Sequence, residues 1–399
     1  MNVILVSTVG LLVVAILVAL LARRLSLPYT VGLVATGIAL APLSSRLGPM
    51  LSHDLIYLVI LPPLLFEAAI SIHWNELRRD LVPVLVLSTI GVVISAVVTA
   101  GGMAYFLGWP LTSALLFGVL IAATDPVAVI ALFKDLGVKG RLKLLVESES
   151  LFNDGVAAVL FALVLAWAMA PATPLGALPA AWALVKISGG GIAAGLLVGG
   201  AVLLLAGRTL DHLVSAALTT AAAYGSFLLA EHFHFSGVLA TVAAGLLIGN
   251  VAVLGRADFK AFSSREREFV LGLWEFAAFI ANSVIFLLIG VTVAKVPLLG
   301  LGWKLLLTAI GLVVLGRLLT VYPLCLVFAR SRWAIPMRDM HVLWWGGLRG
   351  ALALALALSL PPSLPFAYEI RIATFAVVIF SVLFQGLTMP LLLRKLGRT

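Results

Sequence analysis

A polar stretch at residues 147–155, Glu-Ser-Glu-Ser-Leu-Phe-Asn-Asp-Gly, lies in an otherwise apolar part of the sequence. In a helix, four-residue spacing places Ser150 over Asp154 on one face. The same spacing places Glu149 over Asn153 on an adjacent face. The first pair offers a carboxylate and a hydroxyl, which suit a proton or a weakly dehydrated Na⁺. The second pair offers a carboxylate that an arginine can neutralise.

A second candidate site is the Thr124-Asp125-Pro126 tripeptide. Proline removes a backbone donor and disfavours helix at the residue before it, so we expect a helix break here that frees carbonyl groups for a cation. A broken helix is tolerated in a membrane only where it is buried in protein or lines a cavity. Two roles remain open for Asp125, which either caps the half-helix that follows or binds the ion directly.

The composition places these groups in a membrane protein. Of the 399 residues, 63% are apolar and 11% are charged, which is more apolar surface than a soluble chain of this length buries in one core. The apolar segments are continuous over about 20 residues and do not alternate, so they predict membrane helices and exclude a barrel. The sequence therefore predicts an all-α polytopic membrane protein in contact with the lipid bilayer.

Breaks at charged, Pro-rich and Gly-rich residues divide the chain into thirteen predicted transmembrane helices. The spans are 3–22, 28–44, 54–72, 81–107, 111–133, 142–170, 178–206, 211–231, 236–252, 268–293, 302–329, 339–360 and 367–393. In the seventh span, Gly191, Gly195 and Gly199 share one face and predict a close approach by a neighbouring helix.

The basic residues orient these helices. Of the 26 Lys and Arg residues, 19 lie at loops that follow odd-numbered spans, and three lie within spans. The remaining four, on the other side, are Arg46, Lys295, Lys304 and Arg371. The positive-inside rule then puts the N-terminus outside and the C-terminus in the cytoplasm. This topology accounts for the net charge of +9, and we expect no nucleic-acid partner.

Ionisable residues inside predicted spans are costly in lipid, so each needs a partner or a function. The candidates are Glu67, Asp125, Glu149, Asp154, Glu275, Arg317 and Arg349. Glu67 follows a Pro-Pro pair and is expected to bind the ion, because a lone glutamate in an apolar span is functional by default. Glu275 lies near the end of its span and is predicted to be interfacial. Glu147, nearer the cytoplasmic end of its helix, is predicted to be solvated or interfacial.

A second interrupted helix is predicted at residues 346–350, Gly-Gly-Leu-Arg-Gly. It belongs to helix twelve, and the Thr-Asp-Pro break belongs to helix five. If helices one to six repeat as eight to thirteen, both are fifth in their half, and the offset of seven inverts their direction. Interrupted helices at matching positions of two inverted six-helix repeats indicate the central site of a transporter. The seventh helix, 178–206, becomes a linker.

At these residues the sequence resembles the NhaP/NHE family of monovalent cation:proton antiporters. The matching stretches are LPPLLFEAA at 61–69, AATDPVAVIALFKDL at 122–136, ESESLFNDG at 147–155, NSVIFLLIG at 282–290 and WGGLRGAL at 345–352. They follow the family's order along most of the chain, and TDPVAV together with ESLFNDG is highly specific. Ser148 departs from the pattern, because the family more often has glycine there.

The resemblance implies crossing of the interrupted helices five and twelve, and a homodimer with an interface domain and a moving ion-transport core. The interface domain covers 1–72 and 211–293, and the core covers 81–170 and 302–393.

The resemblance also assigns roles. Asp154 carries the cation and the proton, helped by Ser150, Glu67 and the Thr124 carbonyl. Asn153 and Asp125 organise the crossing. An Asn-Asp pair in place of two aspartates resembles the electroneutral branch, in which one cation exchanges for one proton.

The family's buried ion pair joins Glu149 to an arginine, and the sequence offers two. Arg317 is favoured, while Arg349 lies on the interrupted helix and can instead satisfy free carbonyls there. Either arginine would be expensive if buried without a partner.

The predicted function is Na⁺/H⁺ antiport, with Li⁺ as a further substrate, in the cell's inner (plasma) membrane. We expect no cofactor and no enzymatic activity. K⁺/H⁺ antiport is the alternative, because oxygen ligands do not reveal the size of a cavity from sequence. An intramembrane aspartyl protease also needs two buried aspartates, but it should lack the cationic partners and the inverted pair of interrupted helices. A cation channel would need a ring of selectivity residues and would not move protons in the opposite direction.

Overall fold

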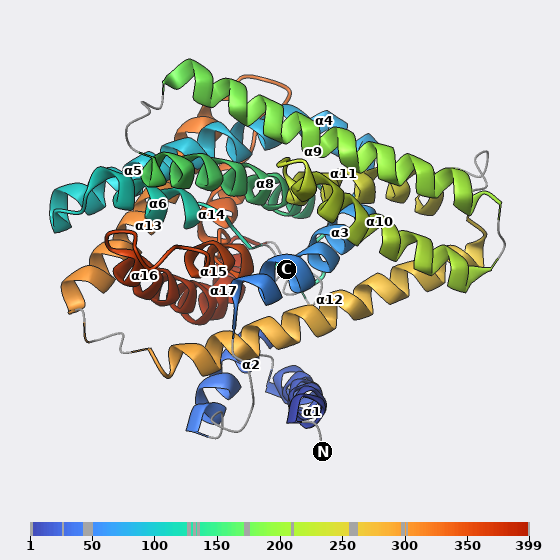
Figure 1. The fold of residues 1–399 in the computed structure, drawn as a ribbon, viewed down its shortest axis with the longest axis horizontal. Helices are drawn as coiled ribbons and strands as arrows, with labels where there is room; N and C mark the ends of the chain where they lie inside the picture. The colour runs from blue at the N-terminus through green and yellow to red at the C-terminus, as the bar shows by residue number, and fades with distance from the viewer. Residues whose placement is uncertain are drawn as a thin grey trace.

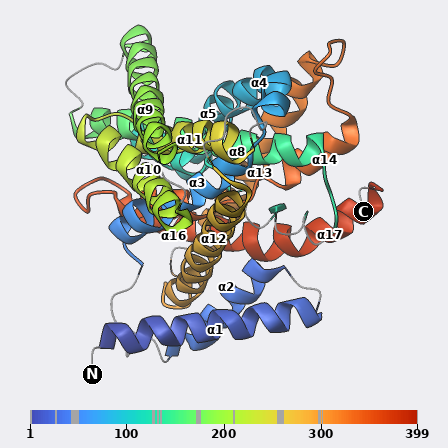
Figure 2. The ribbon, with the colours of Figure 1, turned by 90° about the vertical axis from the view of Figure 1, so that its right-hand side faces the viewer.

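The computed structural model describes residues 3–25, 28–42, 51–125, 129–130, 133, 136–170, 176–208, 211–254, 262–296, 300 and 302–397. Within these ranges the chain is helical and contains no strand, which confirms the predicted fold class (Figure 1). Seven helices in the described ranges are long and apolar enough to cross a membrane, by length and composition. Figures 1 and 2 place α9 on one side of the molecule and α1 on the opposite side.

Each predicted span contains helix in the structure. In the first half the helices are α1 (Val3–Leu25), α2 (Tyr29–Leu40), α3 (Leu61–Ser71), α4 (Trp74–Ser88), α5 (Ile90–Leu107), α6 (Leu111–Leu120) and α8 (Arg141–Met169). The rest are α9 (Ala177–Ala206), α10 (His212–His232), α11 (Gly237–Ile248), α12 (Ser264–Val293), α13 (Trp303–Val327), α14 (Met337–Trp345), α15 (Ala351–Leu358), α16 (Ala367–Ile379) and α17 (Gly386–Lys395). Single π-helical segments at 55–60, 249–253 and 380–385 adjoin α3, α11 and α17.

Large apolar side chains cover the outside of the bundle. On α9, Leu178 is 82% exposed and Leu204 is 73% exposed. Leu17 and Leu20 of α1 are also exposed. Such surfaces are avoided in water but are favourable against lipid tails. The exposure therefore supports a multi-pass membrane protein.

Glycines let several helices pack backbone to backbone. A Cβ atom on Gly195 would overlap the carbonyl oxygen of Ala240, so α9 and α11 meet closely at the predicted glycine face. At the crossing of α2 and α12, a Cβ on Gly290 would overlap the carbonyl oxygen of Val34. A Cβ on Gly37 would likewise overlap the carbonyl oxygen of Leu287. Small residues at such crossings are typical of membrane helix interfaces.

The α2–α12 crossing yields a stability prediction. Gly290→Ala should lower the melting temperature of the detergent-solubilised protein, because the added methyl group meets backbone atoms that cannot turn away. Gly272→Ala is the matched control on the same helix, where a Cβ has nothing within 4 Å. The control should be neutral or slightly stabilising, since alanine favours helix by about 1 kcal/mol over glycine. Equal melting temperatures for the two variants would contradict the close crossing.

Candidate functional site

Two non-helical segments meet in the middle of the protein. Helix α6 ends at Leu120 and the described chain continues without helix to Asp125, while 346–350 separates α14 from α15. The Asp125 amide donates to the Leu348 carbonyl at 2.7 Å, which joins the two segments directly. Both predicted interruptions are therefore present and in contact. Pro126 lies outside the described residues.

Arg349 satisfies the carbonyl groups that the first break exposes. Its Nη1 donates to the carbonyl oxygens of Ala122 at 2.6 Å and Ala123 at 2.9 Å. The side chain is 1% exposed. Its own backbone N–H donates to the Ser381 hydroxyl at 3.0 Å. Arg349 thus holds the crossing together, because lipid tails offer no hydrogen-bond donors to these carbonyl groups.

The close approach of the two segments requires glycine at position 350. A Cβ there would overlap the carboxylate of Asp125. Asp125 therefore lies against the second break as well as within the first. The structure brings it to the crossing, where the resemblance places it.

A buried ion pair lies behind the crossing. Arg317 on α13 donates to both carboxylate oxygens of Glu149 on α8, at 2.6 and 2.8 Å. Its Nη2 also donates to the Leu343 carbonyl at the end of α14, at 3.0 Å. Glu149 is 1% exposed and Arg317 is 6% exposed. Of the two candidate arginines, Arg317 pairs with Glu149 and Arg349 bonds the carbonyls, so each buried arginine has partners.

Asp154 lies on the other polar face of α8. It is 8% exposed, and its Oδ1 has no hydrogen-bond partner among the described residues. One turn earlier, the Ser150 hydroxyl lies 2.8 Å from the Thr124 hydroxyl. That bond ties α8 to the first break and places the hydroxyl groups one turn from the carboxylate. The Asn153 amide faces Glu149, with its Nδ2 at 3.5 Å from Oε1.

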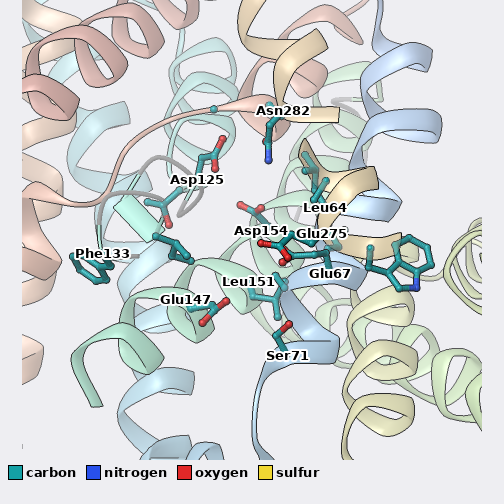
Figure 3. Close-up of a pocket in the computed structure, with 18 of the residues that line it drawn as sticks. Leu64, Glu67, Ser71, Asp125, Phe133, Glu147, Leu151, Asp154, Glu275 and Asn282 are labelled. Carbon is teal, nitrogen blue, oxygen red and sulfur yellow. The ribbon is translucent and has the colours of Figure 1, made fainter. Parts of the chain in front are cut away.

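Asp154 and Thr124 line a cavity of about 540 Å³, together with Asp125 and Glu67. Ser150, Asn153 and Glu149 lie behind this lining. Because a water molecule occupies about 30 Å³ of liquid, the cavity is large enough for a hydrated ion. Figure 3 shows Asp154, Glu67 and Glu275 pointing toward one another in its centre, with Asp125 to one side. Among the described residues, no three His, Cys, Asp or Glu side chains lie close enough to form a resident metal centre. The arrangement offers separated oxygen ligands around one buried carboxylate.

Three lining residues were not predicted to lie here. Glu275 was predicted to be interfacial and Glu147 solvated or interfacial; both line the cavity, and Glu275 is also exposed. Asn282 also lines it and was noted only as part of a motif. Glu275 and Asn282 are seven residues apart, which puts them on one face of α12. This seven-residue spacing of two polar residues in an apolar span could have predicted that one face of α12 lines the cavity.

Comparison with known proteins gives consistent matches. The transmembrane sodium/hydrogen exchanger family model matches residues 11–395. The chain is 42% identical to the Na⁺/H⁺ antiporter ApNhaP of Aphanothece halophytica, over 93% of this chain and 70% of that protein. It is 34% identical to the Na⁺/H⁺ antiporter NhaP of Pseudomonas aeruginosa, over 94% and 92%. In fold it is similar to the sodium proton antiporter MjNhaP1 of Methanocaldococcus jannaschii, with a TM-score of 0.77, 22% identity and 99% of both chains covered.

The buried ion pair yields a prediction about stability. Glu149→Gln leaves the Arg317 charge buried without its counter-ion, which costs about 3–5 kcal/mol. Thermal unfolding in detergent should show a large loss of melting temperature. The matched control is Glu76→Gln on an exposed turn of α4, which should cost at most about 1 kcal/mol. A Glu149→Gln protein as stable as the control would show that the pair does not hold α8 against α13.

Proposed function

Because the chain belongs to the sodium/hydrogen exchanger family, we propose that it is a secondary transporter exchanging Na⁺ for H⁺ at Asp154. Family membership makes it a membrane transporter and not an enzyme. The observation that carries the proposal is the Asp154 carboxylate, nearly buried, with one oxygen unpartnered, in a cavity beside two interrupted helices. Helices of this kind surround the central site in many transporters.

Competition for one carboxylate couples the two fluxes. An ionised carboxylate at this depth is costly unless a cation or a proton neutralises it. Both occupants use the same oxygens of Asp154, so binding of one excludes the other. If the protein changes its access only with the site neutralised, Na⁺ and H⁺ must cross in opposite directions. No separate gate is required.

The cation's proposed ligands are Asp154, Ser150, Glu67 and the Thr124 carbonyl. The bond between the Ser150 and Thr124 hydroxyls supports this set, because it fixes both residues next to the carboxylate. Glu67 reaches the same cavity from α3. Oxygen ligands of this type suit hard cations. Li⁺ is a further proposed substrate, and K⁺ remains the alternative.

We propose an electroneutral exchange of one cation for one proton. Its support lies in the charges around Asp154. The carboxylate of Glu149 is paired with Arg317, and the neighbour of Asp154 is the neutral amide of Asn153. Asp154 is then the carboxylate that gains and loses its neutralising partner in each cycle.

The transport cycle is proposed to move a core, 81–170 and 302–393, against an interface domain, 1–72 and 211–293. The ion pair and the crossing bind core helices to one another, and the α2–α12 glycine contact does the same in the interface domain. The 178–206 helix links the two.

We further propose a homodimer in the inner membrane, with the N-terminus outside and the C-terminus in the cytoplasm. Lys139 and Lys143 line the cavity, which supports an opening on the cytoplasmic side in that topology.

Replacement of the carboxylate tests the proposal. Asp154→Asn should abolish Na⁺-dependent proton movement in proteoliposomes, because an amide can neither carry a proton nor neutralise a cation. Asp54→Asn is the matched control, since Asp54 is exposed and lies outside the cavity. The control should exchange like the unmodified protein. Sodium-dependent proton flux in a folded Asp154→Asn protein would contradict the assignment.

The pH dependence of exchange follows from the competition. Transport should be slow at acidic pH, where protons hold Asp154, and slow at alkaline pH, where protons are scarce. Raising the Na⁺ concentration should shift the acidic limb of this bell to lower pH, because more Na⁺ displaces the proton. The measurement is the initial exchange rate across a pH series at several Na⁺ concentrations. An acidic limb that does not move with Na⁺ would exclude a shared site.

A further inference from the structure

Helix α12 contributes a polar side chain that has no role in the scheme above. Asn282 lines the cavity, and Figure 3 shows it pointing toward Asp154. In the described part of the chain, eight buried side-chain polar atoms lack a hydrogen-bond partner. Of these eight, Oδ1 of Asp154 and Oδ1 of Asn282 belong to residues that line the cavity. Two residues with an unpartnered oxygen thus line one cavity, from the two helices α8 and α12.

An unpartnered amide oxygen is expensive to keep. Leaving a buried acceptor unsatisfied costs about 1–3 kcal/mol. Its cavity-lining neighbours one turn away on α12, Ala278 and Phe279, offer it no polar side chain. An unsatisfied buried group of this kind needs a physical explanation, such as a bound ion or a water molecule.

The backbone that carries Asn282 is held firmly. The hydroxyl of the next residue, Ser283, lies 2.6 Å from the Tyr29 hydroxyl on α2. The Tyr29 ring stacks on Phe279 with centroids 5.5 Å apart. Further along α12, Gly290 fixes the close crossing with α2. Asn282 is therefore presented from a rigid wall, as a preorganised ligand should be.

We propose that Asn282 contacts the transported ion as a neutral ligand of the Asp154 site. Its amide oxygen completes the cation's oxygen shell when Na⁺ occupies the site. A half-turn about its last side-chain bond exchanges Oδ1 and Nδ2, so the same amide donates an N–H to the carboxylate when Na⁺ has left. The proposal rests on the proposed exchange at Asp154. Because the amide carries no charge, it leaves the one-for-one balance unchanged.

A fixed amide also bears on selectivity. Asp154 and Asn282 approach the ion from different helices, α8 and α12, so their separation sets which ionic radius both oxygens can reach. Losing one neutral ligand should affect Li⁺ and Na⁺ differently, since the two ions differ in size and in dehydration cost. A residue with only a structural role would not alter that ratio.

The test uses Asn282→Leu, which keeps a similar volume without polar atoms, and Asn282→Ala. In proteoliposomes, the apparent KM for Na⁺ should rise about tenfold in both, as expected for the loss of one buried polar interaction. The maximal rate at saturating Na⁺ should stay near that of the unmodified protein, and the Na⁺ to Li⁺ preference should change. Thr292→Val is the matched control, because Thr292 has an unpartnered buried oxygen on the same helix but does not line the cavity.

Other outcomes of these experiments would overturn either this proposal or the proposed function. An unchanged KM for both ions in either Asn282 variant would overturn the proposal, even if stability falls, because the amide would then serve only a water molecule. If a folded variant does not exchange, Na⁺-dependent thermal stabilisation measures binding directly. An unshifted Na⁺ midpoint would again overturn the proposal. Absence of exchange in the unmodified protein would instead overturn the proposed function.

Discussion

The crossing of the two interrupted segments is the constraint on which the rest of the structure depends. Each break leaves backbone groups without helical partners, and lipid cannot satisfy them. The structure satisfies them internally, through the Asp125 amide on the Leu348 carbonyl and the Arg349 guanidinium on the Ala122 and Ala123 carbonyls. Gly350 is then required, because any side chain there would displace the Asp125 carboxylate. The breaks are stable only as a pair, so their position fixes where the cavity can form.

The same apolar membrane interior determines how the buried charged side chains are paired. Arg349 is committed to backbone carbonyls and Arg317 to Glu149, so neither residue neutralises Asp154 by a direct hydrogen bond. Asp154 keeps an unpartnered oxygen beside the ordered hydroxyls of Ser150 and Thr124. This arrangement favours a mobile cation over a permanent protein partner. Binding and release at one carboxylate then account for coupling, with Asn282 on α12 as the proposed neutral contact.

The sequence predicts the helices and the α8 site well, because hydropathy and four-residue spacing act locally. It predicts the first break at Pro126, yet helix α6 already ends at Leu120, since the carbonyls beyond it bond to Arg349 from a distant segment. Which of Arg317 and Arg349 pairs with Glu149 depends on how each helix is rotated about its axis, and the sequence alone does not determine that rotation. Glu275 was assigned to the membrane interface from its distance to the span's end. It is exposed on α12 and also lines the cavity, which hydropathy along the chain does not reveal.

The central claim is that Na⁺ and H⁺ share the Asp154 carboxylate. The most direct measurement is proton release from the purified, detergent-solubilised protein in weak buffer as Na⁺ is added. The account predicts that protons are released in proportion to the Na⁺ bound, most strongly at a pH where Asp154 is protonated, and that Asp154→Asn releases none. Saturable Na⁺ binding without proton release across the whole pH range would contradict a shared carboxylate.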